Sequence, residues 1–394
     1  MEDKKNDSFL MISFLLLISL PAYRCLMFVL NLAGVEVPLR MFHIYLLLMV
    51  YMLVLLIKYR MPLKSAGAVL GIIAFYGVSY MWASPQTKEY FNSTEVTSIF
   101  LAFAPIACFC TARVNKWDKL FEDRFILIFT DTVIVLSLIS KIQDVSVADN
   151  MTFSYELLPL WGICLISAFY YRHKAQWIFF IVGVFEGLIF GSRGPILWVI
   201  ILAFSTWLLL SNEDIRSKRY GHLVPGILIF IIAIVAVQFL LPLIMQSAFS
   251  NVSYVLRRLQ GGSLLEGAGR DILYDGCRKI IREMGLSING LFYDRTVLPN
   301  GLYSHNIVYE VLISLGWIFG IPFLLFIFYS IGKSFLVQNI SGKVIVMFFV
   351  STLFLRYFVS GSIFDEAQFV LFMGFIFSML SPKSSTRKKK EQGA

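Results

Sequence analysis

Charged residues are scarce in this chain. Lysine, arginine, aspartate and glutamate make up 15% of its 394 residues, whereas soluble domains carry about 25%. Apolar residues make up 58%, and apolar runs of about 18 or more residues recur along the whole length, as is typical of helices that cross a bilayer. These proportions exclude a soluble globular protein. We expect an all-α membrane protein that forms a single polytopic domain over residues 1–394.

Motifs of metal and nucleotide chemistry are also missing. Cys108 and Cys110 are close together, but no second cysteine pair completes a metal site. The chain has no nucleotide-type phosphate loop, no His-Glu-x-x-His and no Gly-x-Ser-x-Gly pattern. Asp365 and Glu366 are adjacent, which is not the spacing of a metal motif. The sequence therefore predicts no metal, no cofactor and no use of ATP.

The positive charges are distributed as in a multi-pass membrane protein. The net charge of +9 could indicate nucleic acid, but the excess lies in short loops and in a basic tail from Lys383 to Lys390. Retention of such segments on the cytoplasmic side accounts for it, and no nucleic acid partner is predicted. Both termini are then cytoplasmic, which requires an even number of spans. We predict twelve, at roughly residues 9–33, 41–57, 66–83, 96–112, 125–141, 154–171, 175–191, 195–211, 223–247, 305–331, 343–360 and 366–381.

One long hydrophilic loop, at about residues 249–304 between spans 9 and 10, departs from this charge pattern. It is predicted to lie outside, yet it is rich in basic residues, among them Arg257, Arg258, Arg270 and Arg295. Long loops escape the topology rule, so their charge needs another explanation. From Ile272 to Met284, apolar residues recur at helical spacing with the charges mainly on the other face. This pattern predicts an amphipathic helix on the outer membrane surface, although a helix that only caps the bundle would show the same pattern.

His305 is the one histidine that lies both on the predicted outer side and at the start of a span. A neutral imidazole there could accept a proton from a hydroxyl group. A helix-capping or interfacial histidine is the alternative. We consider its neighbours Tyr303, Asn306 and Glu310, together with Arg295, as candidates for binding a substrate.

Arg193 lies where one predicted span ends and the next begins, between Gly191 and Gly194 and before Pro195. The glycines allow a sharp turn and a close approach of a ligand to backbone N–H groups. Pro195 fits the first turn of the following helix, whose N-terminus adds partial positive charge. A phosphate would be well held there. The alternative is an arginine that extends its charge to the membrane interface.

Arg24 and Arg356 fall within predicted spans, where an arginine is costly unless it faces a cavity or a partner. Arg356 is near the outer end of its span and could pair with Asp365 or Glu366. Arg24 has no obvious partner in the sequence. Either arginine could help to bind pyrophosphate, and either could form a purely structural ion pair.

Arg193, Arg270 and His305 share the predicted outer side, with no metal-ligand cluster nearby. This combination favours a site that holds a lipid-linked pyrophosphate. Pyrophosphate leaves as a weak base, so a general acid is unnecessary. Arginines can stabilise the developing anion without a metal.

Three segments resemble the family of bacterial O-antigen polymerases and O-antigen ligases. They are Gly191-Ser192-Arg193-Gly194 before a span, Gly269-Arg270 with the amphipathic stretch to Gly290, and His305-Asn306-Ile307 through Leu315-Gly316 to Gly320. The resemblance implies a C-type glycosyltransferase bundle that uses undecaprenyl-pyrophosphate-linked glycans at the outer face of the bacterial inner membrane. It implies that Arg193 and Arg270 hold the pyrophosphate, as Arg356 could, and that His305 activates the acceptor. Arg24, Arg257, Arg258, Arg295, Tyr303, Asn306 and Glu310 are the further candidates for binding substrate.

The resemblance favours a polymerase of surface polysaccharide. Gly316 and Gly320 are spaced Gly-x-x-x-Gly, whereas the ligases have Gly-x-x-Gly. We expect a glycosyltransferase that works with a lipid-linked donor and acceptor, membrane lipid and a chain-length regulator protein. A ligase that transfers glycan to the lipid A core is the alternative. A flippase or transporter is a third reading, but the chain shows no internal repeat, and transport does not explain the long basic loop.

Overall fold

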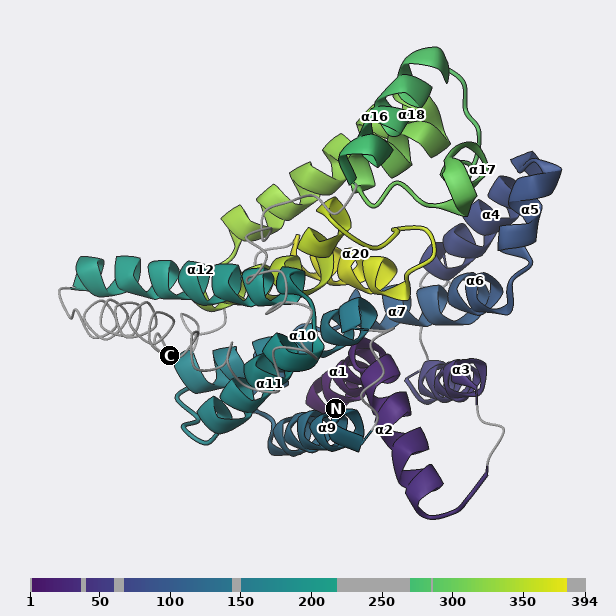
Figure 1. Cartoon of the computed structure of the whole chain (residues 1–394). Helices are drawn as coiled ribbons and strands as arrows, with labels where there is room; N and C mark the ends of the chain where they lie inside the picture. Colours follow the sequence, from purple (N-terminus) through teal and green to yellow (C-terminus); the bar gives the residue numbers. More distant parts are fainter. Residues whose placement is uncertain are drawn as a thin grey trace, which may run out of the picture.

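The computed structural model describes residues 2–36, 40–59, 67–143, 150–217, 270–284 and 286–380, and within these ranges every regular element is a helix (Figure 1). The first half holds α1 (Glu2–Leu17), α2 (Ser19–Leu32), α3 (Met41–Lys58), α4 (Gly67–Trp82), α5 (Pro85–Phe91), α6 (Thr94–Ser98), the π-helix η2 (Ile99–Phe103), α7 (Ala104–Thr111), α8 (Lys119–Glu122), α9 (Arg124–Gln143), α10 (Asn150–Phe169), α11 (Gln176–Phe190) and α12 (Arg193–Ser217). The second half holds α16 (Arg270–Met284), α17 (Asp294–Val297), the 3₁₀-helix η4 (Pro299–Gly301), α18 (Ile307–Val337), α19 (Ile340–Phe349), the π-helix η5 (Val350–Phe354), the 3₁₀-helix η6 (Leu355–Phe358) and α20 (Ala367–Met379).

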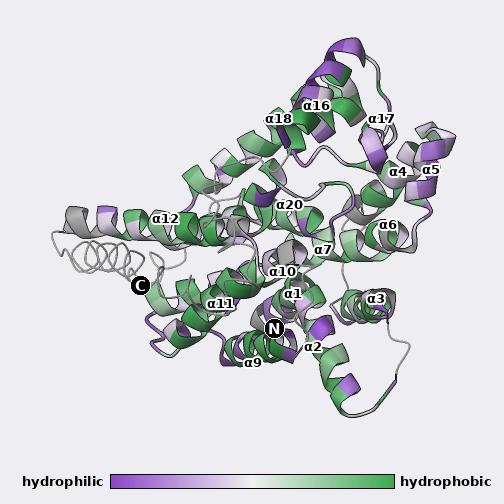
Figure 2. Cartoon of the chain, in the orientation of Figure 1, coloured by the Kyte–Doolittle hydropathy of each residue, from purple (hydrophilic) through white to green (hydrophobic). Residues whose placement is uncertain are grey.

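Several of these helices are long and apolar enough to cross a membrane (Figure 2). Five qualify singly, and up to seven qualify if each of two bent pairs is one span. Shorter apolar helices cover four further predicted spans, at His43–Lys58, Leu70–Trp82, Gln176–Phe190 and Ala367–Met379. The predicted span at 223–247 lies outside the described residues. The all-helical class is therefore confirmed for the described residues, and the count of twelve spans stays a prediction.

The first predicted span, 9–33, is not one straight helix, because α1 and α2 meet at 70°. Pro21 sits in the first turn of α2 and cannot donate a backbone hydrogen bond to the turn before it. The Ser19 hydroxyl instead donates to the Leu16 carbonyl at 3.0 Å. A second bend, of 66°, separates Pro85–Phe91 from Val96–Thr111.

Helix α18 is also broken, at Gly316, whose φ of 65° lies in the left-handed region. A Cβ at this position would lie 2.4 Å from the Ser287 carbonyl oxygen, so only glycine lets the chain after α16 approach so closely. The Asn289 and Gly290 N–H groups donate to the Ser314 carbonyl at 3.1 and 2.9 Å. The loop after α16 thus supplies hydrogen bonds that the broken helix lacks, and Gly316 has a structural reason to be glycine.

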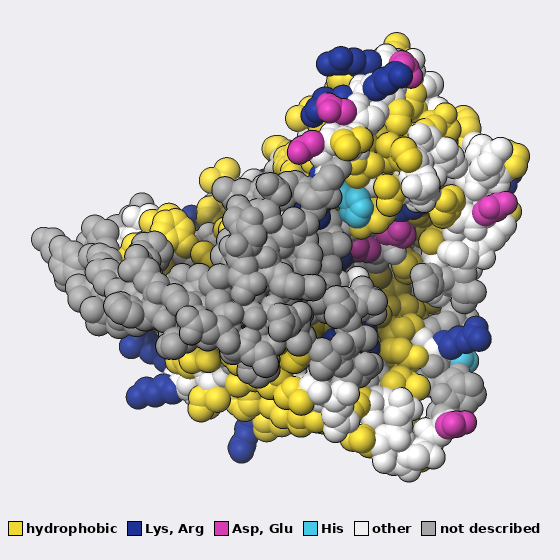
Figure 3. Space-filling view, viewed as in Figure 1, with side chains coloured by type: hydrophobic (Ala, Val, Ile, Leu, Met, Phe, Trp, Pro, Cys, Tyr) yellow, Lys and Arg dark blue, Asp and Glu magenta, His cyan; other side chains and the backbone are white. Residues whose placement is uncertain are grey.

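Helix α16 lies within the predicted outer loop and ends at Met284, as its apolar spacing predicted. Its buried residues Cys277 and Ile281 pack with Leu298 and Ile313, which joins it to α18. Arg278, Lys279 and Arg282 of this helix are exposed, although Arg278 also donates to the Tyr309 hydroxyl of α18 at 3.3 Å, and charged side chains gather at this end of the molecule (Figure 3).

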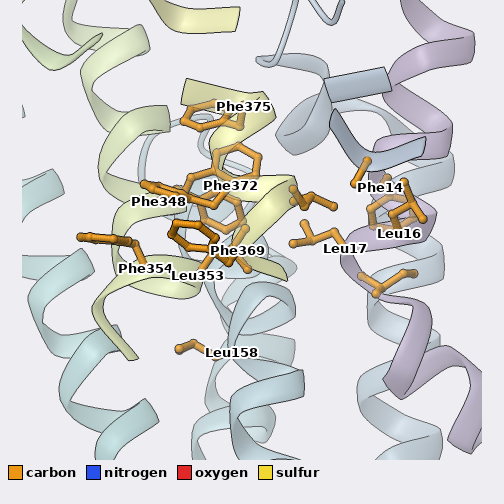
Figure 4. Packing of buried hydrophobic residues seen from close by; sticks show 14 of the residues in the cluster. Phe14, Leu16, Leu17, Leu158, Phe348, Leu353, Phe354, Phe369, Phe372 and Phe375 are labelled. Carbon is orange, nitrogen blue, oxygen red and sulfur yellow. The ribbon is translucent and has the colours of Figure 1, made fainter. Parts of the chain in front are cut away.

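A phenylalanine-rich core supports the segment between α19 and α20 (Figure 4). The rings of Phe349 and Phe375 stack with centroids 3.7 Å apart, and those of Phe354 and Phe372 stack at 5.0 Å. Trp117 contacts Phe349 and Phe375 edge-on. Truncating one such buried ring to alanine costs about 3–5 kcal/mol. This rigid base holds residues 355–366 in place beneath the polar cluster described next.

Candidate functional site

His305 lies just before α18, in a conformation that few non-glycine residues adopt, with φ of 52°. Its ring packs on Tyr303 with centroids 3.8 Å apart. Asn306 caps α18 by accepting from the Val308 N–H at 2.9 Å and also donates to the Phe358 carbonyl at 3.0 Å. Asn306 thus ties the start of α18 to η6 and fixes the backbone beside His305. The His305 Nδ1 atom is buried and has no hydrogen-bond partner within the described part of the chain.

The surroundings of His305 keep its imidazole neutral. Burial lowers its pKa to about 4, and the positive charges of Arg270 and Arg295 add to the effect. A neutral ring can accept a proton at physiological pH. His305 is therefore in the neutral state that a general base needs.

Arg295 is the centre of a buried ion-pair network. Its guanidinium lies 2.9 Å from Asp294, 2.5 Å from Asp365 and 3.8 Å from Glu310. Asp294 also accepts from the Ser304 N–H at 3.0 Å. Because three carboxylates surround it, Arg295 holds the cluster together and is not a cation open to a ligand.

Glu310 holds the segment before α20 against α18. Its carboxylate accepts from the Ile363 N–H at 3.0 Å and bonds to the Ser362 hydroxyl. Tyr303 adds a third link, because its hydroxyl accepts from the Gly361 N–H at 3.2 Å. Substrate binding by Glu310 and Tyr303 stays a prediction. Their hydrogen bonds to Ser362, Ile363 and Gly361 hold residues 361–363 in position.

Arg356 pairs with Glu366 at 2.9 Å, one of the two partners that the sequence suggested, and also donates to Gln368 at 2.6 Å. Its guanidinium lies 4.7 Å from the centroid of the Tyr155 ring. A cavity of about 360 Å³ is lined by Arg356, Glu366, Gln368 and Glu156. Tyr155 is not part of this lining. Among the described residues, Arg356 is therefore the one cation in a lining that also holds the carboxylates of Glu156, Asp365 and Glu366.

The turn between α11 and α12 meets the same tyrosine. Helix α12 begins at Arg193, so the turn is tighter than the predicted span edges implied. A Cβ on Gly194 would lie 2.2 Å from the Tyr155 hydroxyl oxygen. The backbone at the N-terminus of α12 and the Arg356 guanidinium thus both lie close to the Tyr155 side chain.

Arg270, the first residue of α16, completes the group. Its charge acts on His305, and also on Tyr274 and Tyr155. None of the ion pairs within the described residues includes its guanidinium. Among the described arginine side chains of this group, Arg270 is therefore the one with donors to offer, while the Arg193 side chain lies outside the described part of the structure. Arg257 and Arg258, also predicted to bind substrate, lie outside the described residues.

Arg24 is not part of this site. It pairs with Glu156 of α10 at 3.1 Å, which corrects the reading that Arg24 lacks a partner. Its side chain is 37% exposed and that of Glu156 is 4% exposed, so the pair lies at the edge of the protein interior. The partner is separated by 132 residues and leaves no local trace in the sequence.

Sequence reasoning missed Tyr155, Glu156 and Gln368 as residues of this region. Glu156 carried a usable signal, because a carboxylate inside a predicted span is costly and needs a partner. Tyr155 and Gln368 carried none, since an aromatic or amide side chain in an apolar run is common. Comparison of the chain with protein-family models found no match, and comparisons with curated proteins and with solved structures found none either.

Proposed function

We propose that this protein is a glycosyltransferase that polymerises surface polysaccharide, such as the O antigen of lipopolysaccharide. It would move a growing glycan from undecaprenyl pyrophosphate onto a second lipid-linked repeat unit. The observation that carries the proposal is that Arg270, a cation without an ion-pair partner among the described residues, lies close enough to act electrostatically on His305, a neutral base whose buried Nδ1 atom has no partner there. A transferase with an anionic leaving group and a hydroxyl acceptor needs these two functions together.

The reaction follows from these positions. The acceptor hydroxyl gives its proton to the His305 imidazole and attacks the anomeric carbon of the donor sugar. The bond from that carbon to the pyrophosphate oxygen breaks, and its electron pair leaves with the pyrophosphate. Arg270 and the N-terminus of α12 are the groups that would stabilise the departing anion. Arg295 and Asn306 contribute by keeping His305 in place.

The proposal also includes a setting in the bacterial inner membrane. With twelve spans and both termini in the cytoplasm, the loop at 249–304, which includes α16, would lie at the outer face, where the proposed reaction would join lipid-linked repeat units. The amphipathic character of α16 supports a position at the membrane surface. A chain-length regulator protein would be its partner there.

Reconstitution tests the proposal directly. Purified protein in lipid nanodiscs is incubated with a lipid-linked repeat unit alone, and the products are separated on a gel. A ladder of increasing length is expected from a polymerase. Absence of a ladder, with transfer appearing only after lipid A core is added, would instead identify a ligase. His305→Gln in the same nanodiscs should suppress the ladder.

A further inference from the structure

A second cavity, of about 600 Å³, lies between α2, α9 and α10. Its lining includes Arg24 and Asn31 from α2, Lys141 from α9 and Glu156 from α10. It shares only Glu156 with the cavity beside Arg356. The C-terminal ends of α2 and α9 and the N-terminal part of α10 meet here, and the predicted topology puts all three on the outer side. On that topology the cavity lies on the same side of the membrane as His305.

Two cations of this cavity have donors to offer an anion. The single hydrogen bond that Arg24 makes within the described residues joins its Nη2 atom to Glu156 at 3.1 Å, which orients the guanidinium but leaves its other N–H groups. The Lys141 ammonium lies 4.9 Å from the centroid of the Phe153 ring. None of the ion pairs within the described part of the chain includes Lys141, although its charge acts on the buried Glu186 of α11. Both contacts hold a charged group at the cavity.

Apolar side chains flank this charged cavity on the outside of the helices. On α2, Leu26, Val29 and Leu32 are exposed, with Leu32 at 63%. On α9, Ile139 and Ile142 are exposed, with Ile142 at 61%. Because both helices belong to candidate membrane spans, these faces would meet lipid chains. A cationic cavity beside an apolar face matches a ligand with an anionic head and a hydrocarbon tail.

We propose that this cavity binds the diphosphate head of a second lipid-linked molecule, the acceptor, while the Arg270 site holds the donor. The assignment to the acceptor rests on the proposed polymerase function, because that reaction joins two lipid diphosphates. The binding of a diphosphate lipid in this cavity does not depend on the polymerase function. Glu156 lines both this cavity and the one beside Arg356.

Farnesyl diphosphate is the probe, and native mass spectrometry of the full-length protein counts the molecules bound. The wild type should bind two. Lys141→Gln should lower the affinity for one of the two probe molecules by about tenfold or more, the loss expected for a charge-assisted hydrogen bond. Arg270→Gln should lower the affinity for the other one. Arg124→Gln, at the opposite end of α9, is the matched control and should leave both unchanged.

Lys141→Gln is the decisive variant because it keeps the Arg24–Glu156 pair and therefore the fold of this region. Unchanged binding of two probes by Lys141→Gln would overturn the inference. So would equal competition by phosphatidylglycerol, which would indicate an ordinary membrane lipid, or binding of inorganic pyrophosphate as tight as that of the probe. Farnesol, which lacks the phosphates, should not compete.

The gel assay separates this inference from the proposed function. A ladder from the wild type together with normal probe binding by Lys141→Gln would support the polymerase function and contradict the second site. The opposite outcome is that the wild type binds two probes but produces no ladder, and that Lys141→Gln loses one of the two probes. It would support the second diphosphate site and contradict the polymerase function.

Discussion

Gly194 lies so close to Tyr155 that a methyl group on its Cα would be 2.2 Å from the tyrosine hydroxyl oxygen. Tyr155 in turn carries the Arg356 guanidinium on its ring. The glycine at the start of α12 therefore sets the distance between this helix and the buried arginine. Any side chain at Gly194 must move Tyr155 or α12.

The first prediction concerns this contact. Gly194→Ala should destabilise the protein by about 1–3 kcal/mol, because an added carbon must displace a buried ring. It should also reduce glycan transfer, since Arg356 loses its support. Gly71→Ala is the matched control, because a Cβ there has no atom within 4 Å. Thermal unfolding of both variants, measured in the same detergent, checks the difference, and equal unfolding temperatures would contradict the packing argument.

The second prediction tests the guanidinium of Arg270. Arg270→Lys keeps the charge but not the planar fork that holds two phosphate oxygens. The rate of transfer should fall about ten- to a hundredfold, as for the loss of a charge-assisted hydrogen bond. Arg282→Lys, on the exposed part of the same helix, is the control. If Arg270→Lys produced a normal ladder, the arginine would supply only a general positive field.

The third prediction concerns His305. Because its pKa is lowered to about 4, the base is already neutral at physiological pH, and its contribution to the rate should be lost only as the pH falls through about 4. His305→Gln keeps hydrogen bonding but cannot take the proton, so the rate should fall by about 10²–10⁴. The rate is measured in nanodiscs with the lipid-linked repeat unit. A Gln variant that is nearly as fast as the wild type would leave His305 an orienting role only.

The fourth prediction uses Glu366, whose pKa burial raises to about 7. The folded protein then binds a proton that the unfolded chain has lost, so this group makes stability fall as the pH rises through about 7. His305 changes the stability with pH in the opposite direction, because its pKa in the folded protein, about 4, is below the ordinary 6.5. Above pH 6.5 it does not change the stability with pH. Between pH ~6.5 and ~8, the unfolding temperature should therefore decline more steeply in the wild type than in Glu366→Gln. Glu283→Gln, on exposed α16, should keep the wild-type slope.

The fifth prediction concerns topology. Asn300 and Asn115 are both exposed, and the five natural cysteines are all buried, so the background of thiol labelling should be low. Asn300→Cys should react with a membrane-impermeant thiol reagent on intact spheroplasts, whereas Asn115→Cys should react only after lysis. Labelling of Asn115→Cys from outside would reverse the predicted orientation.

Patterns that repeat along the chain were enough to predict the membrane class, the helix that ends at Met284 and the start of a helix after His305. Helical periodicity and end signals are local, since they record which face of a helix is buried and where its backbone hydrogen bonds stop. The pairing of Arg356 with Glu366 could also be anticipated, because only ten residues separate them.

Contacts between distant segments could not be predicted in this way. Arg24 meets Glu156 across 132 residues, and Arg295 meets Asp365 across 70. The sequence therefore left Arg24 without a partner and placed Arg295 among the substrate-binding residues, whereas the fold engages both in ion pairs. A charged side chain carries no mark of which partner will neutralise it, because that depends on how the helices pack. Packing thus separates Arg295, which three carboxylates surround, from Arg270, whose guanidinium is open to a ligand among the residues described.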